Sequence, residues 1–260
     1  MNILQATKNF IYKLKALKSP KRGKFNFDNS VLDVAIGYNQ YGAYCFPSKA
    51  YLRPAVQNVM RNAIYEPDTI KFISNVLAKN NGDIVHAGTF FGDFLPALSK
   101  SAIGSKQKIW AFEPNVESYK CAQITLLLNN IKNVVLTNAG LGNDVKTEHL
   151  LIKDDAGNNI GGASHLVNEA KNNQTQLVSI VKIDDAVSTS NSISLIQLDV
   201  EGYELNALKG ALKTIKQHLP VLILEDNANA IESEWFKNNI LILGYSKTTN
   251  LHSNKVFSVK

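Results

Sequence analysis

From Asp83 onward the chain alternates short apolar runs with longer amphipathic stretches, and this rhythm constrains the fold more than any other feature. The apolar runs have the length of buried strands, whereas the stretches between them have the length and periodicity of helices. Strands that alternate with helices form a parallel sheet, because each helix carries the chain back across the sheet. The first five elements are expected at 84–87, 94–100, 109–112, 119–129 and 134–138.

The same rhythm resumes after a polar segment over residues 143–176. Strands are expected at 177–182, 194–199 and 221–225, helices at 205–217 and 232–238, and two short closing strands at 240–244 and 255–259. The fold class is therefore predicted to be α/β, with a doubly wound, mostly parallel, Rossmann-like sheet.

The residues before Asp83 have a different character. A helix is expected at 66–79, where Pro67 suits the first turn and apolar side chains share one face. Residues 19–67 mix prolines, glycines and tyrosines without a long period, which predicts an irregular cap. We therefore expect a basic N-terminal extension over residues 1–65, helical or irregular in structure, and a catalytic domain over residues 66–260.

Most of the formal charge of +6 lies near the N-terminus, at Lys8, Lys13, Lys15, Lys18, Lys21, Arg22 and Lys24. Apolar residues at near-helical spacing between them permit a basic amphipathic helix that contacts an anionic membrane surface peripherally; the alternative is a solvated tail or a docking helix. The sequence has no run of about 18 apolar residues and no secretion signal. Cys45 and Cys121 show no paired spacing. We therefore expect a cytoplasmic protein.

A nucleotide cofactor is expected where the first strands end. Glycines at the strand-to-helix turn let a cofactor approach the backbone, and Glu113 ends the next strand 21 residues beyond Gly92, near the offset at which a carboxylate reaches ribose hydroxyls. The alternative for the glycines is an ordinary turn. The expected cofactor-binding residues are His86, Gly88, Thr89, Gly92, Asp93, Glu113, Asn138 and Gly140.

Acidic residues gather where two later strands end. Asp199 and Glu201 lie two residues apart, so they face the same side if the strand geometry continues, and the next strand ends in Glu225 and Asp226. Four clustered carboxylates need a compensating cation, and oxygen ligands suit Mg²⁺. Such an ion could lower the pKa of a substrate hydroxyl while a remaining carboxylate takes its proton. By contrast, Glu204 is expected to cap the following helix.

Two further regions face the expected site. His165 lies in a glycine-rich loop that could reach substrate, although a lone loop histidine is also typical of a surface. In the cap, the tyrosines of segment 38–44 together with Arg53 and Pro54 would suit a glycan or an anionic head group, with core packing as the alternative.

These motifs together resemble the FkbM family of S-adenosylmethionine-dependent methyltransferases. The resemblance covers residues 83–226 and rests on HAGTFFGDF, AFEPN, GGASHLV, VKIDDAV, LDVEGYELNALKGA and LPVLILED as an ordered set. It implies a class I methyltransferase fold, with seven strands of which the last is reversed, and methyl transfer to a hydroxyl of a sugar or natural product. His86 departs from the pattern, because the family commonly has Asp there.

The acidic cluster is also similar to that of macrocin-type sugar O-methyltransferases, in which such residues hold Mg²⁺ and the base. Carried onto this chain, the resemblance implies Asp199, Glu225 and Asp226 as metal ligands and Glu201 as base, with Asp199 and His165 as further catalytic candidates. The acceptor is then expected to be a small molecule or a glycan.

Two competing functions remain at this stage. A nucleic-acid methyltransferase would suit the basic N-terminus, but the turn after the strand at 194–199 reads Asp-Val-Glu-Gly rather than the Asn-Pro-Pro-Tyr-like turn of amino-methylating enzymes, so nucleic acid is not the expected partner. A cofactor-fold binding protein without catalysis is suggested by His86, whereas Glu113 and the carboxylate cluster favour an enzyme.

Overall fold

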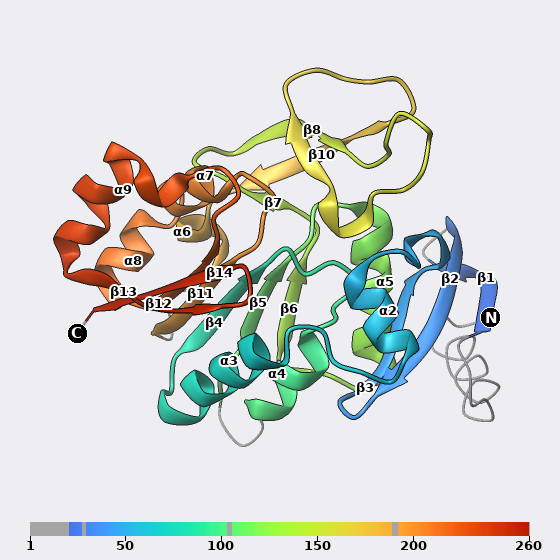
Figure 1. Ribbon diagram of the computed structural model, residues 1–260, viewed down its shortest axis with the longest axis horizontal. Helices are drawn as coiled ribbons and strands as arrows, with labels where there is room; N and C mark the ends of the chain where they lie inside the picture. Colours follow the sequence, from blue (N-terminus) through green and yellow to red (C-terminus); the bar gives the residue numbers. More distant parts are fainter. Residues whose placement is uncertain (1–20, 28–29, 103–105, 189–191, 260) are drawn as a thin grey trace.

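Seven strands form the main sheet, in the order β13-β14-β12-β11-β4-β5-β6 (Figure 1). Five of them run parallel, and β14 is antiparallel to both of its neighbours, β12 and β13. The bounds are β4 Asp83–Ala87, β5 Ile109–Phe112, β6 Val134–Thr137, β11 Ile193–Leu198, β12 Val221–Glu225, β13 Tyr245–Leu251 and β14 Asn254–Val259. The predicted doubly wound, mostly parallel α/β fold is confirmed.

The structure is a computed structural model that describes residues 21–27, 30–102, 106–188 and 192–259. The amphipathic helix predicted within the first 20 residues, and with it the membrane contact, lies outside the described residues. Among the helices that the structure does describe, none is long and apolar enough to cross a membrane.

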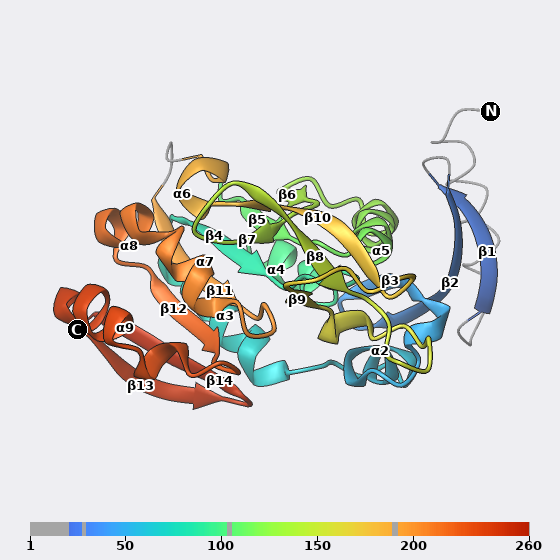
Figure 2. The ribbon, with the colours of Figure 1, turned by 90° about the horizontal axis from the view of Figure 1, so that it is seen from above.

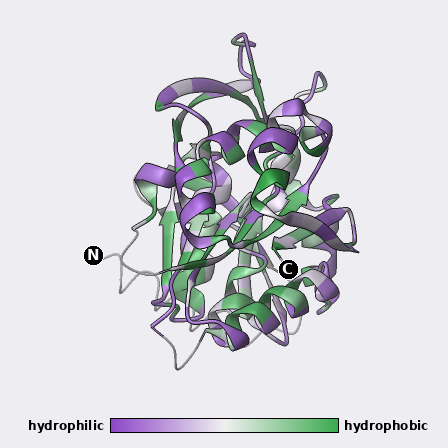
Figure 3. Cartoon of the chain, turned by 90° about the vertical axis from the view of Figure 1, so that its left-hand side faces the viewer, coloured by the Kyte–Doolittle hydropathy of each residue, from purple (hydrophilic) through white to green (hydrophobic). Residues whose placement is uncertain are grey.

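Both faces of the main sheet are buried, which explains the continuous apolar runs of its strands. Ile84 and Leu195 pack on one side against α3 (Pro67–Lys79) and α4 (Leu95–Ser101). Val85 and Ile196 point to the other side, towards α7 (Glu204–Lys209), α8 (Leu212–His218) and α9 (Glu234–Asn239). Apolar residues accordingly concentrate on the strands and on the inward faces of the helices in Figure 3.

A second sheet forms around the segment that the sequence analysis described only as polar, residues 143–176. Its order is β7-β10-β8-β9, with bounds β7 Gly140–Leu141, β8 Lys146–Leu151, β9 His165–Val167 and β10 Thr175–Val181. The strand predicted at 177–182 therefore exists, but it belongs to this sheet. The second sheet lies above the main sheet in Figure 1 and overlies it in Figure 2.

The N-terminal part contains a third sheet where an irregular cap was expected. β1 (Lys21–Phe27), β2 (Ser30–Asn39) and β3 (Gly42–Pro47) are antiparallel and lead into η1 (Ser48–Ala50) and α2 (Pro54–Met60). The free edge of β3 is bonded by side chains of α5 (Val116–Leu128) and its C-cap: the Cys45 N–H donates to Thr125 Oγ1 at 3.0 Å, and the Ala43 N–H to Asn129 Oδ1 at 3.0 Å. The sheet is thus docked on the main domain through α5. The domain division at residue 65 stays a prediction.

Two elements near the C-terminus differ from the expected ones. The helix expected at 205–217 is divided into α7 and α8 at Gly210, where a Cβ would lie 1.9 Å from Gly142 O and where the carbonyl accepts from Asp184 N–H in α6 (Ile183–Ala186). The strand expected at 240–244 is instead the short helix η4 (Leu241–Leu243), and β13 begins after Gly244, whose φ is +92°.

Candidate active site

A cavity of about 330 Å³ opens where β4, β5, β11 and β12 end. This is the edge at which open α/β sheets bind ligands, and the volume lies in the range of small-molecule sites. Besides the ends of these strands, its walls include Arg53 and Pro54 from the N-terminal part and Gly161, Gly162 and His165 from the segment that carries β9. η2 (Gly161–Ala163) and β9 carry these last residues.

The loop after β4 is shaped by its two glycines. Gly88 has a φ of +82°, and a Cβ there would lie 1.8 Å from Asp199 O, so only glycine lets the end of β11 pack on this loop. Gly92, with a φ of +81°, turns the chain into α4. Between them Phe90 has a φ of +50°, a conformation rare for a non-glycine residue. Gly88 and Phe90 line the cavity, whereas Gly92 lies behind it.

Glu113 holds this loop in place and also lines the cavity. One carboxylate oxygen accepts from the Phe90 N–H at 2.7 Å and the other from the Asn115 N–H at 2.9 Å. Burial raises the pKa of Glu113 to about 8, although these two bonds act to lower it. The predicted position of Glu113 in the cofactor pocket is therefore matched by its geometry, and the residue has a structural role that the sequence did not indicate.

His86 occupies the strand end as a neutral ring. Its Nδ1 pairs with Gln197 Oε1 at 2.8 Å and its ring stacks on Phe94 with centroids 5.4 Å apart. Burial lowers the pKa of His86 to about 4. The Gln197 contact assigns the proton to Nδ1, because a carbonyl oxygen only accepts. Nε2 is then a buried acceptor with no hydrogen-bond partner among the described residues, in a residue that lines the cavity.

The other predicted cofactor residues divide into two groups. Asp93 and Gly140 line the cavity, and burial raises the pKa of Asp93 to about 7. Thr89 and Asn138 do not line it: Thr89 is fully buried with its hydroxyl on His86 O, and the Asn138 amide donates to the carbonyl oxygens of Glu113 and Pro114. These two residues therefore support the site from behind.

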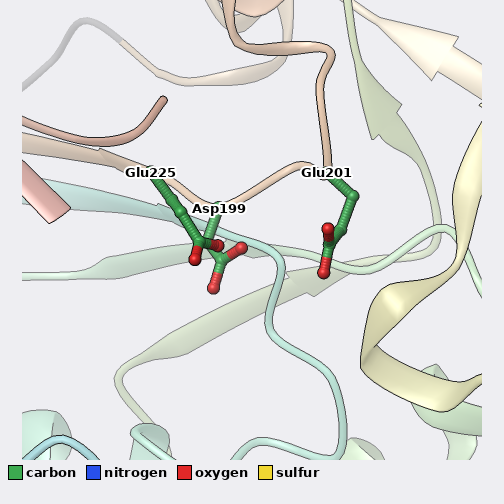
Figure 4. A group of neighbouring side chains, drawn as sticks. All are labelled: Asp199, Glu201 and Glu225. Carbon is green, nitrogen blue, oxygen red and sulfur yellow. The ribbon is translucent and has the colours of Figure 1, made fainter. Parts of the chain in front are cut away.

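Three carboxylates meet at the opposite end of the cavity (Figure 4). Asp199, Glu201 and Glu225 each offer an oxygen atom, and these atoms lie within 4.8 Å of one another. β11 ends at Leu198, so the strand alternation used to predict the pairing of Asp199 with Glu201 does not continue. Instead, Glu201 has a left-handed backbone with a φ of +50°, which turns its side chain back towards Glu225.

The charges of this cluster are shared. Burial, a hydrogen bond to Glu225 and the neighbouring negative charges raise the pKa of Asp199 well above its usual range. The same hydrogen bond lowers the pKa of Glu225, and burial together with the charge of Glu225 raises that of Glu201. The pKa of Asp199 and that of Glu225 are therefore shifted in opposite directions by their mutual hydrogen bond, and the pKa of Glu201 is higher than that of an exposed glutamate.

Two acidic residues near the cluster do not join it. Asp226 was predicted as a metal ligand, but it follows the last residue of β12 and does not line the cavity, and its carboxylate pairs with Lys255 Nζ at 3.0 Å. Glu204 begins α7, yet its carboxylate accepts from Val200 and Gly202 N–H, upstream of the helix. Glu204 therefore fixes the loop that carries Glu201 rather than capping the helix.

The mouth of the cavity contains both predicted and unforeseen residues. His165 lines it, and its charge acts to lower the pKa of Glu201. Of the cap residues, Tyr44 is fully buried in the core, as the packing alternative required, whereas Arg53 reaches the cavity. Tyr65 and Glu66 also line the cavity and were not predicted from the sequence; the Glu66 carboxylate accepts from Thr69 Oγ1 and Asn254 Nδ2.

The chain is similar in fold to several solved structures, each at low identity. A methyltransferase FkbM from Methylobacillus flagellatus aligns at 19% identity and a TM-score of 0.49, covering 68% of this chain and 43% of that one. A SAM-dependent methyltransferase from Aquifex aeolicus aligns at 18% identity and 0.41, covering 74% and 88%. Trm5b from Pyrococcus abyssi aligns at 13% and 0.42, covering 97% and 68%. The chain thus spans less than half of the first of these proteins.

No protein of curated function matches the chain in sequence. The methyltransferase FkbM domain, however, matches residues 80–250. This stretch is about two thirds of the 260 residues, and it includes β4, Glu113, His165 and the three clustered carboxylates. The chain therefore belongs to the methyltransferase FkbM domain family.

Proposed function

We propose that this protein transfers a methyl group from S-adenosylmethionine to a hydroxyl of a sugar, a glycan or a glycosylated small molecule, with Glu201 as the base. The observation that carries the proposal is the continuity of one cavity, which is lined by Glu113 at one end and by the Asp199–Glu201–Glu225 cluster at the other. A methyl donor bound at the first end would share this space with a deprotonating group at the second, as direct transfer requires.

The donor end fits S-adenosylmethionine through several features of the chain. Gly88 brings the loop backbone to the cavity wall, and Glu113 offers carboxylate oxygens at the position from which ribose hydroxyls are bound. Asp93 and His86 line the same cavity. When bound, S-adenosylmethionine supplies an electrophilic methyl group on a sulfonium.

Glu201 is suited to take the proton of the acceptor hydroxyl. Its raised pKa brings the carboxylate closer to the operating pH, where a general base is most effective. The loop that presents it is fixed by Glu204 through the N–H groups of Val200 and Gly202. The left-handed backbone of Glu201 is a sparsely populated conformation, of the kind that tends to be retained at functional sites.

Asp199 and Glu225 have the chemistry to hold Mg²⁺ beside this base, since carboxylate oxygens are its preferred protein ligands. A bound divalent ion would offset their negative charge and would lower the pKa of an acceptor hydroxyl. Glu201, and not Asp226, faces Asp199 and Glu225. Because Glu201 is the proposed base, the proposed metal ligands are Asp199 and Glu225.

The test combines calorimetry with a transfer assay. We expect S-adenosylmethionine to bind, and tritium from its labelled methyl group to appear in a sugar or glycan from a panel that also contains RNA and DNA. Absence of cofactor binding at millimolar ligand would refute the methyltransferase proposal. Transfer to nucleic acid alone would refute the acceptor class, and full turnover in a chelator would refute only the role of the metal.

A further inference from the structure

The guanidinium of Arg53 has neither an ion pair nor a hydrogen bond with any residue that the structure describes. Arg53 lines the cavity and is half-buried, and it is the only lysine or arginine among the described residues of the cavity wall. A guanidinium has five N–H donors and no acceptor, so partial burial without a partner loses hydration with no compensation from the protein. The Arg53 guanidinium therefore has no hydrogen-bond acceptor among the described residues, and a bound ligand can provide one.

The backbone and the stem of Arg53 are fixed. Its N–H donates to Ala50 O at 2.9 Å, and its carbonyl accepts from Gln57 N–H at 3.0 Å in the first turn of α2. Its Cγ lies 3.5 Å from the point where a Cβ on Gly161 would stand, so the aliphatic stem packs under the glycine-rich loop. Gly161 itself has a φ of +52°. The backbone and the first part of the side chain are thus positioned beside the cavity that Arg53 lines.

Arg53 faces the proposed base without touching it. Both residues line the same cavity, and the positive charge of Arg53 acts to lower the pKa of Glu201. No ion pair within 4.0 Å joins them in the described part of the chain. An arginine that served only to neutralise Glu201 would gain most by a direct bidentate contact. A partner for the guanidinium can therefore come from a ligand in the cavity that both residues line.

We propose that Arg53 binds an anionic group of the methyl acceptor, a carboxylate or a phosphate, and presents the adjoining hydroxyl to Glu201. The planar fork of arginine matches both groups bidentately. The acceptor is accordingly an acidic sugar rather than a neutral one. The identification of this group as part of a methyl acceptor depends on the function proposed above, whereas the anion site itself does not.

The acidic lining of the cavity does not prevent such binding. Burial raises the pKa of Asp93 to about 7 and that of Glu113 to about 8, so these carboxyls carry reduced negative charge near neutral pH. Arg53 lies on the N-terminal side of the mouth, on the segment before α2, and the anion needs to reach only the outer part of the cavity.

Binding of three matched sugars tests the proposal: glucuronate, glucose 6-phosphate and methyl glucoside, each titrated into the full chain with and without S-adenosylhomocysteine. We expect at least one of the two acidic sugars to bind about tenfold to a hundredfold more tightly than methyl glucoside, because a hydrogen-bonded charge pair has this effect. The carboxylate and phosphate arms then identify the preferred anion.

Two variants assign the effect to a residue. Arg53→Gln should remove the preference for the acidic sugar, whereas Arg61→Gln, which removes the same charge from an exposed position just after α2, should retain it. Equal binding of all three sugars to the wild-type protein, or an undiminished preference in Arg53→Gln with unchanged circular dichroism, overturns the proposal.

The outcomes separate this inference from the proposed function. Cofactor binding is titrated independently, so a protein that prefers acidic sugars but does not bind S-adenosylmethionine would retain the anion site and lose the methyltransferase proposal. A protein that binds the cofactor and methylates neutral and acidic sugars equally would retain the function and lose the role of Arg53.

Discussion

The carbonyl oxygen of Asp199 lies against Gly88 so closely that a Cβ on Gly88 would be 1.8 Å away. This contact joins the loop after β4, on the cofactor side, to the end of β11, on the carboxylate side. The two halves of the site are thus placed relative to each other by backbone packing and not only by the side chains that line the cavity.

Substitution of Gly88 by Ala should therefore damage both stability and binding. The added methyl group meets Asp199 O and also needs the left-handed φ of +82°, so we expect a loss of about 2–4 kcal/mol in the free energy of unfolding. Gly157→Ala is a matched control, since Gly157 has a φ of +79° but no neighbour within 4 Å. Urea denaturation of the two variants measures the difference. Equal losses would show that the contact with Asp199 is unimportant.

Neutralising Asp199, which follows β11, and neutralising Asp226, which follows β12, should have different effects on kcat and on stability. Asp199→Asn is expected to lower kcat about a hundredfold or more while cofactor affinity stays within a few fold, because Asp199 belongs to the facing carboxylates. Asp226→Asn should spare kcat and instead reduce stability, because Asp226 is paired with Lys255. Steady-state kinetics and calorimetry distinguish the two. A large loss of kcat in Asp226→Asn would return Asp226 to the active site.

Much of the main domain could be predicted from sequence because the patterns that identify its strands and Glu113 lie within short segments of the chain. The strands β4, β5 and β12 are apolar runs buried on both faces, and Glu113 follows β5 at a spacing that any parallel sheet would bring to the cofactor edge. By contrast, the strand that contains Val34, Ala35 and Ile36 is part of the N-terminal sheet and has consecutive buried residues in a segment without clear periodicity, so it was not recognised.

The sequence alone could not predict which carboxylates form the cluster. Glu201 reaches Glu225 through a left-handed backbone, which no propensity predicts for a glutamate. Asp226 was expected to join because it adjoins Glu225, yet β12 ends at Glu225 and the Asp226 carboxylate pairs with Lys255 instead of lining the cavity. The role of Arg53 depends on docking of the N-terminal part against the second sheet, a long-range contact.

Glu113 should make the stability of the ligand-free protein depend on pH. Its pKa is raised to about 8 in the folded state against roughly 4.3 in an unfolded chain, so the folded state binds the proton more tightly. Its contribution is complete below about pH 4 and is lost as the pH rises towards 8. Asp93, with a pKa raised to about 7, acts in the same direction.

We therefore expect Glu113→Gln to flatten the decline in unfolding free energy between about pH 5 and 8, by up to about 1.4 kcal/mol per pH unit. The exposed Glu232→Gln serves as a control for the same change of charge. Urea denaturation at several pH values measures the slopes. Identical slopes in the wild type and Glu113→Gln would contradict a protonated, buried Glu113.

The docking of the N-terminal sheet can be tested at Thr125, whose hydroxyl accepts the Cys45 N–H at 3.0 Å in a fully buried environment. Thr125→Val keeps the shape of the side chain but leaves that N–H without a partner, so we expect a loss of about 1–3 kcal/mol. Thr249→Val, at an exposed position of β13, should change stability little. Urea denaturation of both variants measures the difference.

Arg53 follows this sheet in the chain and lines the cavity, so a destabilised contact at Thr125 should also weaken binding of the acidic sugar. A Thr125→Val variant that loses stability yet binds that sugar normally would show that the cavity mouth is positioned independently of β3.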